Sequence, residues 1–252
     1  GLGSESQNLP AFVVMTDTKG RGLPKGYAQN WSSGFLPGVF QGTALNTQGP
    51  PLDNLARPAD LSDADQRRTL DYLGRLNRRH EQAHPLEAEL DARTRSFELA
   101  YRMQMAAPDA LAWEGEPESI RRLYGVDQPH CGHFAKQCLM ARRLVERGVR
   151  FVQLYSGGEE NERSWDGHLD IAGNHRQFAG ETDQPIAALL TDLKQRGLLD
   201  QTLLVCCGEF GRLPIVQKTK DTNLLGRDHN PHAFTTWFAG GGIKGGTHYG
   251  ET

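Results

Sequence analysis

The sequence predicts an α/β fold with a mainly parallel sheet that is covered by helices on both faces. Two observations lead to this prediction. Near-continuous apolar runs alternate with segments of helical periodicity, and polar clusters follow the apolar runs. Strands buried on both faces have this unbroken apolar character, and strand–helix–strand order is typical of parallel sheets. At 252 residues the chain can bury a sizeable core, and we expect one domain over residues 1–252.

The chain opens with a predicted strand and a long aperiodic segment. Residues 11–16, AFVVMT, are typical of a buried strand. Residues 17–60 are rich in Gly, Pro, Asn and Ser, and a segment of this length without periodicity is often functional. We expect its aromatic side chains to pack against the protein: Trp31, Phe35 and Phe40.

A helical insertion is predicted around residues 61–125. Ser62 or Asp63 caps its first helix, in which leucines follow at helical spacing. A second helix is expected to open at Pro85 and to end at Pro108, and a third lies near PESIRRLYG. We interpret the arginines of the first helix as a solvated face in preference to an anion site: Arg67, Arg68, Arg75, Arg78 and Arg79.

The second half of the chain supplies the other elements of the sheet and its helices. GHFAKQCLMARRLVERG is predicted as a helix that stops at Gly148, and residues 149–156 as a strand. Residues 169–196 carry apolar side chains along one stripe and predict a long helix that Gly197 caps. TLLVCCGEFG and AFTTWFAGGG are predicted as the last two strands.

Composition and missing motifs exclude several classes of protein. Lys+Arg 28 against Asp+Glu 31 gives a net charge of -3, which argues against a nucleic-acid partner. No apolar run approaches the roughly 18 residues of a membrane span. A serine-hydrolase GxSxG elbow and a phosphate-binding GxxxxGK[ST] loop are both absent from the sequence. No CxxC pair supports a zinc finger, and Cys206 and Cys207 are interpreted as core thiols.

Three polar clusters fall at the ends of the predicted strands. They are Asp166 and His168 in WDGH, Glu209 in CCGEFGR, and Asp228, His229 and His232 in GRDHNPH. In open α/β sheets, ligands bind outside the carboxyl ends of the strands, where the first two clusters can meet. The third precedes its strand. The third cluster can join the other two only if the loop 212–232 crosses the same edge of the sheet, or if strand 233–239 runs antiparallel.

The residue types in these clusters suit a metal site. Carboxylate and neutral imidazole bind zinc, manganese or iron, whereas a site with more carboxylates suits magnesium or calcium. Two such ions can clamp an oxyanion and activate water. Arg212 and Arg227 flank the clusters, and a guanidinium suits bidentate binding of phosphate or sulfate.

Each of these residues also has a purely structural interpretation. Asp166 can serve as a turn residue or helix N-cap, and Asp228 can accept from loop amides. Glu209 can form an ion pair with Arg212. His175, on the apolar stripe of the long helix, is interpreted as a satisfied core histidine.

Several motifs together resemble one bacterial family. ARRLVERGVRFVQLY, WDGH, GEFGR, GRDHNPHAF and AGGGIKGG, with NLPAFVVM, WSSGFLPGVFQGT and FELAYRMQ, resemble in the same order the family known as domain of unknown function 1501. The resemblance covers nearly the whole chain. Members are sulfatase-like and look like relatives of the alkaline phosphatase superfamily. This implies a three-layer α/β/α sandwich with a bimetal site at the carboxyl edge of the sheet.

The resemblance assigns roles motif by motif. WDGH resembles the Asp-x-x-x-His ligand pair, with the shorter Asp-x-His spacing at Asp166 and His168. GEFG resembles an Asp-His-Gly position, with Glu209 for the aspartate and Phe210 where a histidine would stand. GRDHNPH resembles a His-x-x-x-Pro loop that offers His229 and Asp228.

The implied activity is a metal-dependent hydrolase of phosphate or sulfate esters, located in the periplasm or outside the cell. One or two divalent ions (zinc, calcium, magnesium or manganese) would be the cofactors. The substrate would be an anionic ester of a small molecule or a glycan. The expected metal ligands are Asp166, His168, Glu209, Asp228 and His229, with Arg212 and Arg227 binding the ester.

The alternative function is a non-catalytic, degenerate member of the superfamily that binds an anionic glycan or a protein partner. Phe210 and the lack of a visible nucleophile favour it. In the family, an export signal and the nucleophile lie upstream of these motifs, so we expect this chain to be a fragment. Thr16, Asp17 and Thr18 are fallback positions for a nucleophile.

Overall fold

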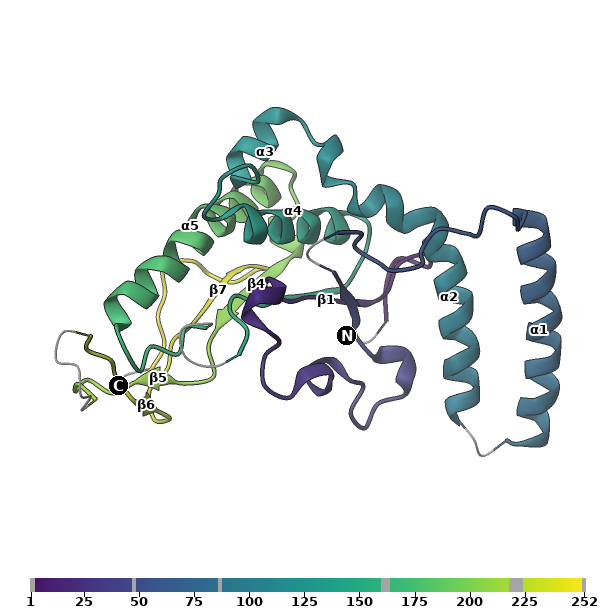
Figure 1. Ribbon diagram of the computed structural model, residues 1–252, viewed down its shortest axis with the longest axis horizontal. Helices are drawn as coiled ribbons and strands as arrows, with labels where there is room; N and C mark the ends of the chain where they lie inside the picture. The colour runs from purple at the N-terminus through teal and green to yellow at the C-terminus, as the bar shows by residue number, and fades with distance from the viewer. Residues whose placement is uncertain (1–2, 47–48, 86–87, 160–163, 218–223, 251–252) are drawn as a thin grey trace. The chain divides into compact units, whose positions relative to one another are not determined.

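The computed structural model of the chain describes residues 3–46, 49–85, 88–159, 164–217 and 224–250 (Figure 1). It is a mixed α/β protein with a three-stranded parallel sheet and helices. The chain divides into two compact units that alternate along the sequence. The first comprises Gly1–Met15, Gly26–Trp113 and Arg143–Gln153, and the second Thr16–Lys25, Glu114–Arg142 and Leu154–Thr252.

The three-stranded sheet has the order β2–β1–β3, with β2 at Thr43–Leu45, β1 at Phe12–Met15 and β3 at Phe151–Leu154. β1 pairs with β2 in parallel, and its last three side chains are buried, as the apolar run predicted. The rings of Phe12 and Phe151 meet edge to face with centroids 4.9 Å apart. The predictions of strands at 11–16 and 149–156 are therefore confirmed, whereas β2 lies in the segment expected to be aperiodic.

Two long helices follow in the first unit, α1 at Asp63–Ala83 and α2 at Ala88–Leu111, and they lie side by side as a hairpin (Figure 1). The Ser62 hydroxyl caps α1 by accepting from the Asp65 N–H at 3.1 Å. The predicted solvated arginine face is confirmed, because all five arginines are exposed. Arg67, for example, pairs with Asp71 one turn away at 2.6 Å.

The prediction that Pro108 ends the second helix is wrong, because α2 continues to Leu111. Ala107, Ala110 and Leu111 are buried at this end of the helix, and the Arg143 guanidinium donates to the carbonyls of Asp109 at 2.6 Å and Ala110 at 3.1 Å. These hydrogen bonds and this burial offset the cost of the helical hydrogen bond that Pro108, which has no N–H, cannot make. Pro85 precedes α2 as a turn residue, and residues 86 and 87 lie outside the described ranges.

The aromatic residues of the long segment differ in their burial. Trp31 is buried as predicted, but Phe35 is 98% exposed, so the expectation for that ring is wrong. Phe35 stands at the corner of a turn that the Leu36 N–H closes on the Ser33 carbonyl at 3.0 Å, and this turn points the ring outward.

The second unit contains α3 at Glu118–Tyr124, α5 at Ile171–Gln195 and the part of α4 (Gly132–Glu146) up to Arg142. The α5 helix is the long helix predicted at 169–196. Asp170 caps its start, and Gly197, with φ of 70°, follows its end. Beneath it, the buried Arg142 pairs with Glu116 at 2.8 Å and Asp192 at 2.9 Å. None of the helices in the described ranges is long and apolar enough to cross a membrane.

The last strands of the second unit form antiparallel pairs. β4 at Leu203–Cys207 pairs with β7 at Thr236–Gly240, and β5 at Gly211–Arg212 pairs with β6 at His229–Asn230. β7 therefore adopts the antiparallel alternative left open for strand 233–239. The interpretation of Cys206 and Cys207 as core thiols is wrong, because both are exposed. A two-stranded pair covers few of its own side chains, so an apolar run here does not imply burial.

Candidate metal centre

The loop between β3 and α5 carries Asp166 and His168. Tight turns shape it, with the Gly167 N–H donating to the Trp165 carbonyl and the His168 N–H to the Asp166 carbonyl, both at 2.9 Å. The N-cap of α5 is Asp170, whose carboxylate accepts from the Gly173 N–H at 3.1 Å. Asp166 is therefore not the helix cap that its position allowed, and its carboxylate faces the histidines instead.

A second segment, residues 225–230, lies directly against this loop. The Ile171 N–H donates to the Leu225 carbonyl at 3.0 Å, and the Arg227 N–H donates to the Gly167 carbonyl at 3.1 Å. Gly226 makes this approach possible, since a Cβ at that position would lie 1.8 Å from the His168 carbonyl oxygen. The two segments therefore meet backbone to backbone.

The β5–β6 pair sets the side chains of this second segment. Arg212 stands opposite His229 in the register. The Phe210 ring packs on the His229 imidazole with centroids 4.3 Å apart. Phe210, which stands where the resemblance expects a ligand histidine, thus packs against His229 instead.

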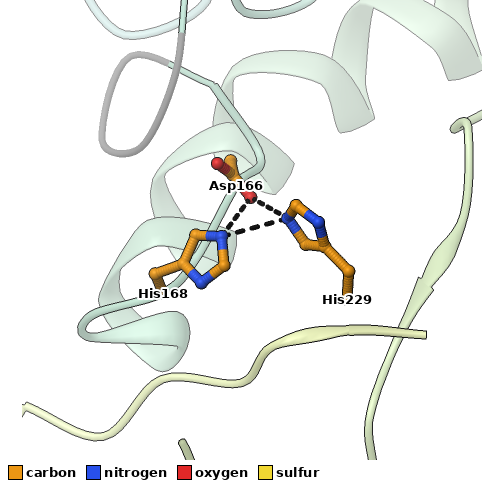
Figure 2. Close-up of side chains that lie close together, drawn as sticks. All are labelled: Asp166, His168 and His229. Atoms are coloured by element: carbon orange, nitrogen blue, oxygen red, sulfur yellow. Dashed lines mark hydrogen bonds and ion pairs between the residues drawn. The ribbon is translucent and has the colours of Figure 1, made fainter. Parts of the chain in front are cut away.

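Asp166, His168 and His229 converge on one point (Figure 2). Asp166 Oδ1 lies 2.9 Å from His229 Nε2 and 3.1 Å from His168 Nε2, and the two Nε2 atoms are 3.0 Å apart. All three side chains are partly buried. We call these three residues the triad.

The triad has the donor set and the spacing that a divalent ion requires. Ligand atoms about 2.0–2.1 Å from a tetrahedral zinc ion lie about 3.3 Å from one another, close to the separations in the triad. His168 Nδ1 lies 2.7 Å from the side-chain oxygen of Gln217, which can accept only if that nitrogen carries the proton. Nε2 of His168 then presents its lone pair to the triad, as a metal ligand must. The residues present therefore fit a divalent ion.

One cation already touches the triad. The Arg212 guanidinium pairs with Asp166 Oδ1 and donates to the Arg227 carbonyl at 2.9 Å. The predicted substrate-binding Arg212 is thus placed beside the triad, whereas the side chain of Arg227 is exposed. The interpretation of Glu209 as the ion-pair partner of Arg212 is wrong, because Asp166 takes that role.

Two expected ligands lie outside the triad. Glu209 is exposed just beyond the end of β4. Asp228 is also exposed, accepts from the His229 N–H at 2.8 Å and lies 4.0 Å from His168 Nδ1. Asp228 therefore accepts a hydrogen bond from a loop amide, as its structural interpretation expected. Of the five expected ligands, the structure brings three together in the triad.

The neighbouring aromatic and histidine residues have packing roles. The Trp165 ring meets His175 edge to face at 5.5 Å and lies 5.4 Å from Phe178. His175 is half-buried, and burial is the main cause that lowers its pKa. His175 is therefore a packed histidine on α5 with a hydrogen-bond partner in Asn174, but it is half-buried and not the core residue that was expected. His232 is exposed and stands outside the triad.

Sequence reasoning did not select Gln217. A lone glutamine in a loop carries no signal of its own, and its link to the triad comes from an isolated bridge with Gly226. Only the folded arrangement shows that it faces His168.

Comparison with known proteins fixes the family. A family model described as "Protein of unknown function (DUF1501)" matches residues 1–252. The chain belongs to this family. No curated protein and no solved structure matches the chain. For this DUF1501 protein, a function must therefore be argued from the triad and its surroundings.

Proposed function

We propose that this DUF1501 protein is a metal-dependent hydrolase of phosphate or sulfate esters. The observation that carries the proposal is the convergence of Asp166, His168 and His229 at ligand spacing. One divalent ion held there, with zinc favoured by the two imidazoles, would supply a Lewis acid and activate water. A substrate oxygen could bind to an ion held by these three residues.

The surrounding side chains have separable roles in this proposal. Gln217 holds the proton on Nδ1 of His168, which keeps Nε2 available to the ion. Phe210 covers one face of the His229 ring and holds its orientation. Arg212 stands beside Asp166 and would place its positive charge near the oxygens of an ester. Arg227, exposed next to it, would extend the positive charge toward solvent.

The family resemblance supports two finer parts of the proposal. One is the three-layer α/β/α sandwich of the alkaline phosphatase superfamily, which an experimental structure tests. The other is a place in the periplasm or outside the cell, where a small-molecule or glycan ester would be the substrate. Fractionation of the native bacterium, with the protein followed by antibody, tests that location.

Metal content tests the triad directly. We expect His229→Ala to remove most of the divalent metal that the full chain retains after dialysis, measured by elemental analysis. His232→Ala is the matched control, because this exposed histidine lies three residues later and outside the triad. Aryl phosphate and aryl sulfate assays then show which ester is cleaved. Equal metal content in both variants would exclude the triad as the metal site.

A non-catalytic function is the alternative, and one observation favours it. Arg212 already neutralises Asp166, so an ion pair can hold the cluster together without a metal. In that case the protein would bind an anionic glycan or a protein partner. Metal-free protein that binds a sulfated polysaccharide and hydrolyses neither aryl ester would support this alternative.

A further inference from the structure

A second cluster of charged side chains lies in the same unit as the triad, and we call it the Asp17 cluster: Asp17, Arg21, His133 and Glu181. Asp17 follows β1 and is buried, with its oxygens accepting from the N–H groups of Gly157 at 2.5 Å and Thr18 at 2.6 Å. Arg21 donates to Asp17 at 2.9 Å and to both oxygens of Glu181 at 2.6 Å.

His133 completes the cluster from the first turn of α4. Its Nε2 lies 3.3 Å from Asp17 and 3.5 Å from Glu181. Both carboxylates are thus matched by donors inside the cluster. Asp17 has no oxygen left for attack on a substrate, which removes it from the fallback nucleophiles.

A cavity of about 430 Å³ opens beside this cluster. This size is in the range of pockets that hold small molecules. The polar groups on its wall include Thr18, Arg21, His130, His133, Arg176 and Glu181. None of them belongs to the triad.

Three donors on the cavity wall have no partner among the residues that the structure describes. They are the guanidinium of Arg176, the imidazole of His130 and the hydroxyl of Thr18. Among the described residues on the wall, Glu181 is the one acidic group, and it is already paired with Arg21. The charge that remains available to a ligand is therefore positive, and it comes from a side chain that suits planar binding of an oxyanion.

We propose that this cavity binds the oxyanion group of a small organic molecule: a phosphate, a sulfate or a carboxylate. Arg176 supplies the charge, and His130 and Thr18 supply further hydrogen bonds. The Asp17 cluster keeps the wall rigid and holds Glu181 away from the anion. The proposal stands on the cavity and its free donors, so it does not depend on metal at the triad.

Calorimetric titration of the full chain, after removal of metal by a chelator, tests this proposal. The probes are inorganic phosphate, phenyl phosphate, phenyl sulfate and benzoate, whose relative affinities identify the oxyanion preferred. We expect saturable binding of at least one probe. Arg176→Gln should weaken it about tenfold, the effect of one charge-assisted hydrogen bond. His130→Asn should weaken the same probe by a smaller factor.

The matched control is Arg79→Gln, which removes an exposed arginine of α1 that is not among the residues lining the cavity. It should leave the affinity unchanged, and circular dichroism should show all three variants folded. Two results would overturn the proposal. One is that no probe binds to the metal-free protein. The other is an equal loss of affinity in Arg79→Gln and Arg176→Gln, which would indicate attraction by net charge alone.

Discussion

The triad and the Asp17 cluster combine the same residue types in one unit, yet they differ in what occupies their centre. In the Asp17 cluster the Arg21 guanidinium stands between two carboxylates and bonds to both. In the triad, Arg212 touches a single carboxylate oxygen, and three ligand atoms still face one another at 2.9–3.1 Å. A cluster with a built-in cation is complete, whereas the triad has room for a second cation.

The comparison shows that residue types alone do not identify a metal site. Carboxylates and imidazoles suit zinc wherever they meet, but a permanent guanidinium at the centre takes the place of the ion. The useful difference is that the two imidazole nitrogens of the triad point at Asp166 and at each other, while Arg212 pairs with Asp166 from outside. Variants of Arg21, Gly226, Gln217 and Asp17 test this distinction.

Arg21→Met should remove the built-in cation and leave two carboxylates facing each other in a largely buried place. Removing one partner of such a buried ion pair lowers the free energy of unfolding by about 3 kcal/mol or more. Urea unfolding of the variant and the wild type measures this loss. Arg67→Met, which breaks an exposed pair on α1, should cost less than about 1 kcal/mol. Similar losses in both variants would contradict the structural role of Arg21.

Gly226→Ala should separate the two segments that carry the triad, because its Cβ would overlap the His168 carbonyl. We expect zinc affinity, measured by competition with a chromogenic chelator, to fall about 100-fold, the upper end of effects outside the ligands themselves. Gly245→Ala is the control, because a Cβ there meets nothing within 4 Å. Unchanged zinc affinity in Gly226→Ala would show that the triad does not depend on this close approach.

Gln217→Leu should weaken zinc binding about tenfold, because the proton on Nδ1 of His168 loses its acceptor. Gln217→Glu keeps an acceptor at that position and should restore the affinity. A loss that is equal in the two variants would point to general disturbance of the loop. The same competition assay measures all three proteins.

The acid stability of the protein should report on the Asp17 cluster. Burial acts to raise the pKa of Asp17, but bonds from His133, Gly157, Thr18 and Arg21 outweigh it and lower the pKa well below the ordinary value of 3.8. A carboxyl whose pKa is lower in the folded state stabilises the fold above its unfolded value. That stabilisation is lost as the pH falls below about 4, by up to about 1.4 kcal/mol per pH unit.

Asp17→Asn removes this contribution. The unfolding free energy of the wild type should fall more steeply than that of the variant between pH 4 and pH 2.5, as denaturant titrations at each pH can measure. Parallel curves for the two proteins would show that Asp17 keeps an ordinary pKa in the folded state.

Local signals predicted much of the fold correctly. The apolar run at 11–16, the Ser62 cap and the stripe over 169–196 each identified an element, because burial and capping leave marks at fixed spacings. Pro108 was misjudged because the burial of Ala110 and Leu111 and the bonds from Arg143 compensate for the lost N–H, which is a tertiary effect. The exposure of Cys206 follows from strand pairing, which an apolar run alone does not reveal.

The site was predicted in part for a related reason. Asp166, His168 and His229 were named because their residue types are the ligands of zinc. Whether Glu209 and Asp228 join them depends on the path of the loop after β5, and the sequence left that path open. Gln217 was missed because its role exists only through contact with His168.

Trp165 gives the molecule an optical reporter. Trp165 immediately precedes Asp166 of the triad in the sequence. Its indole packs on the Phe178 ring, over which the Arg21 guanidinium lies 4.4 Å from the centroid. Indole emission depends on nearby charge and polarity. Filling either the triad or the cavity should therefore change the fluorescence of this one tryptophan, and subtracting the spectrum of Trp165→Phe isolates its signal from the other three tryptophans.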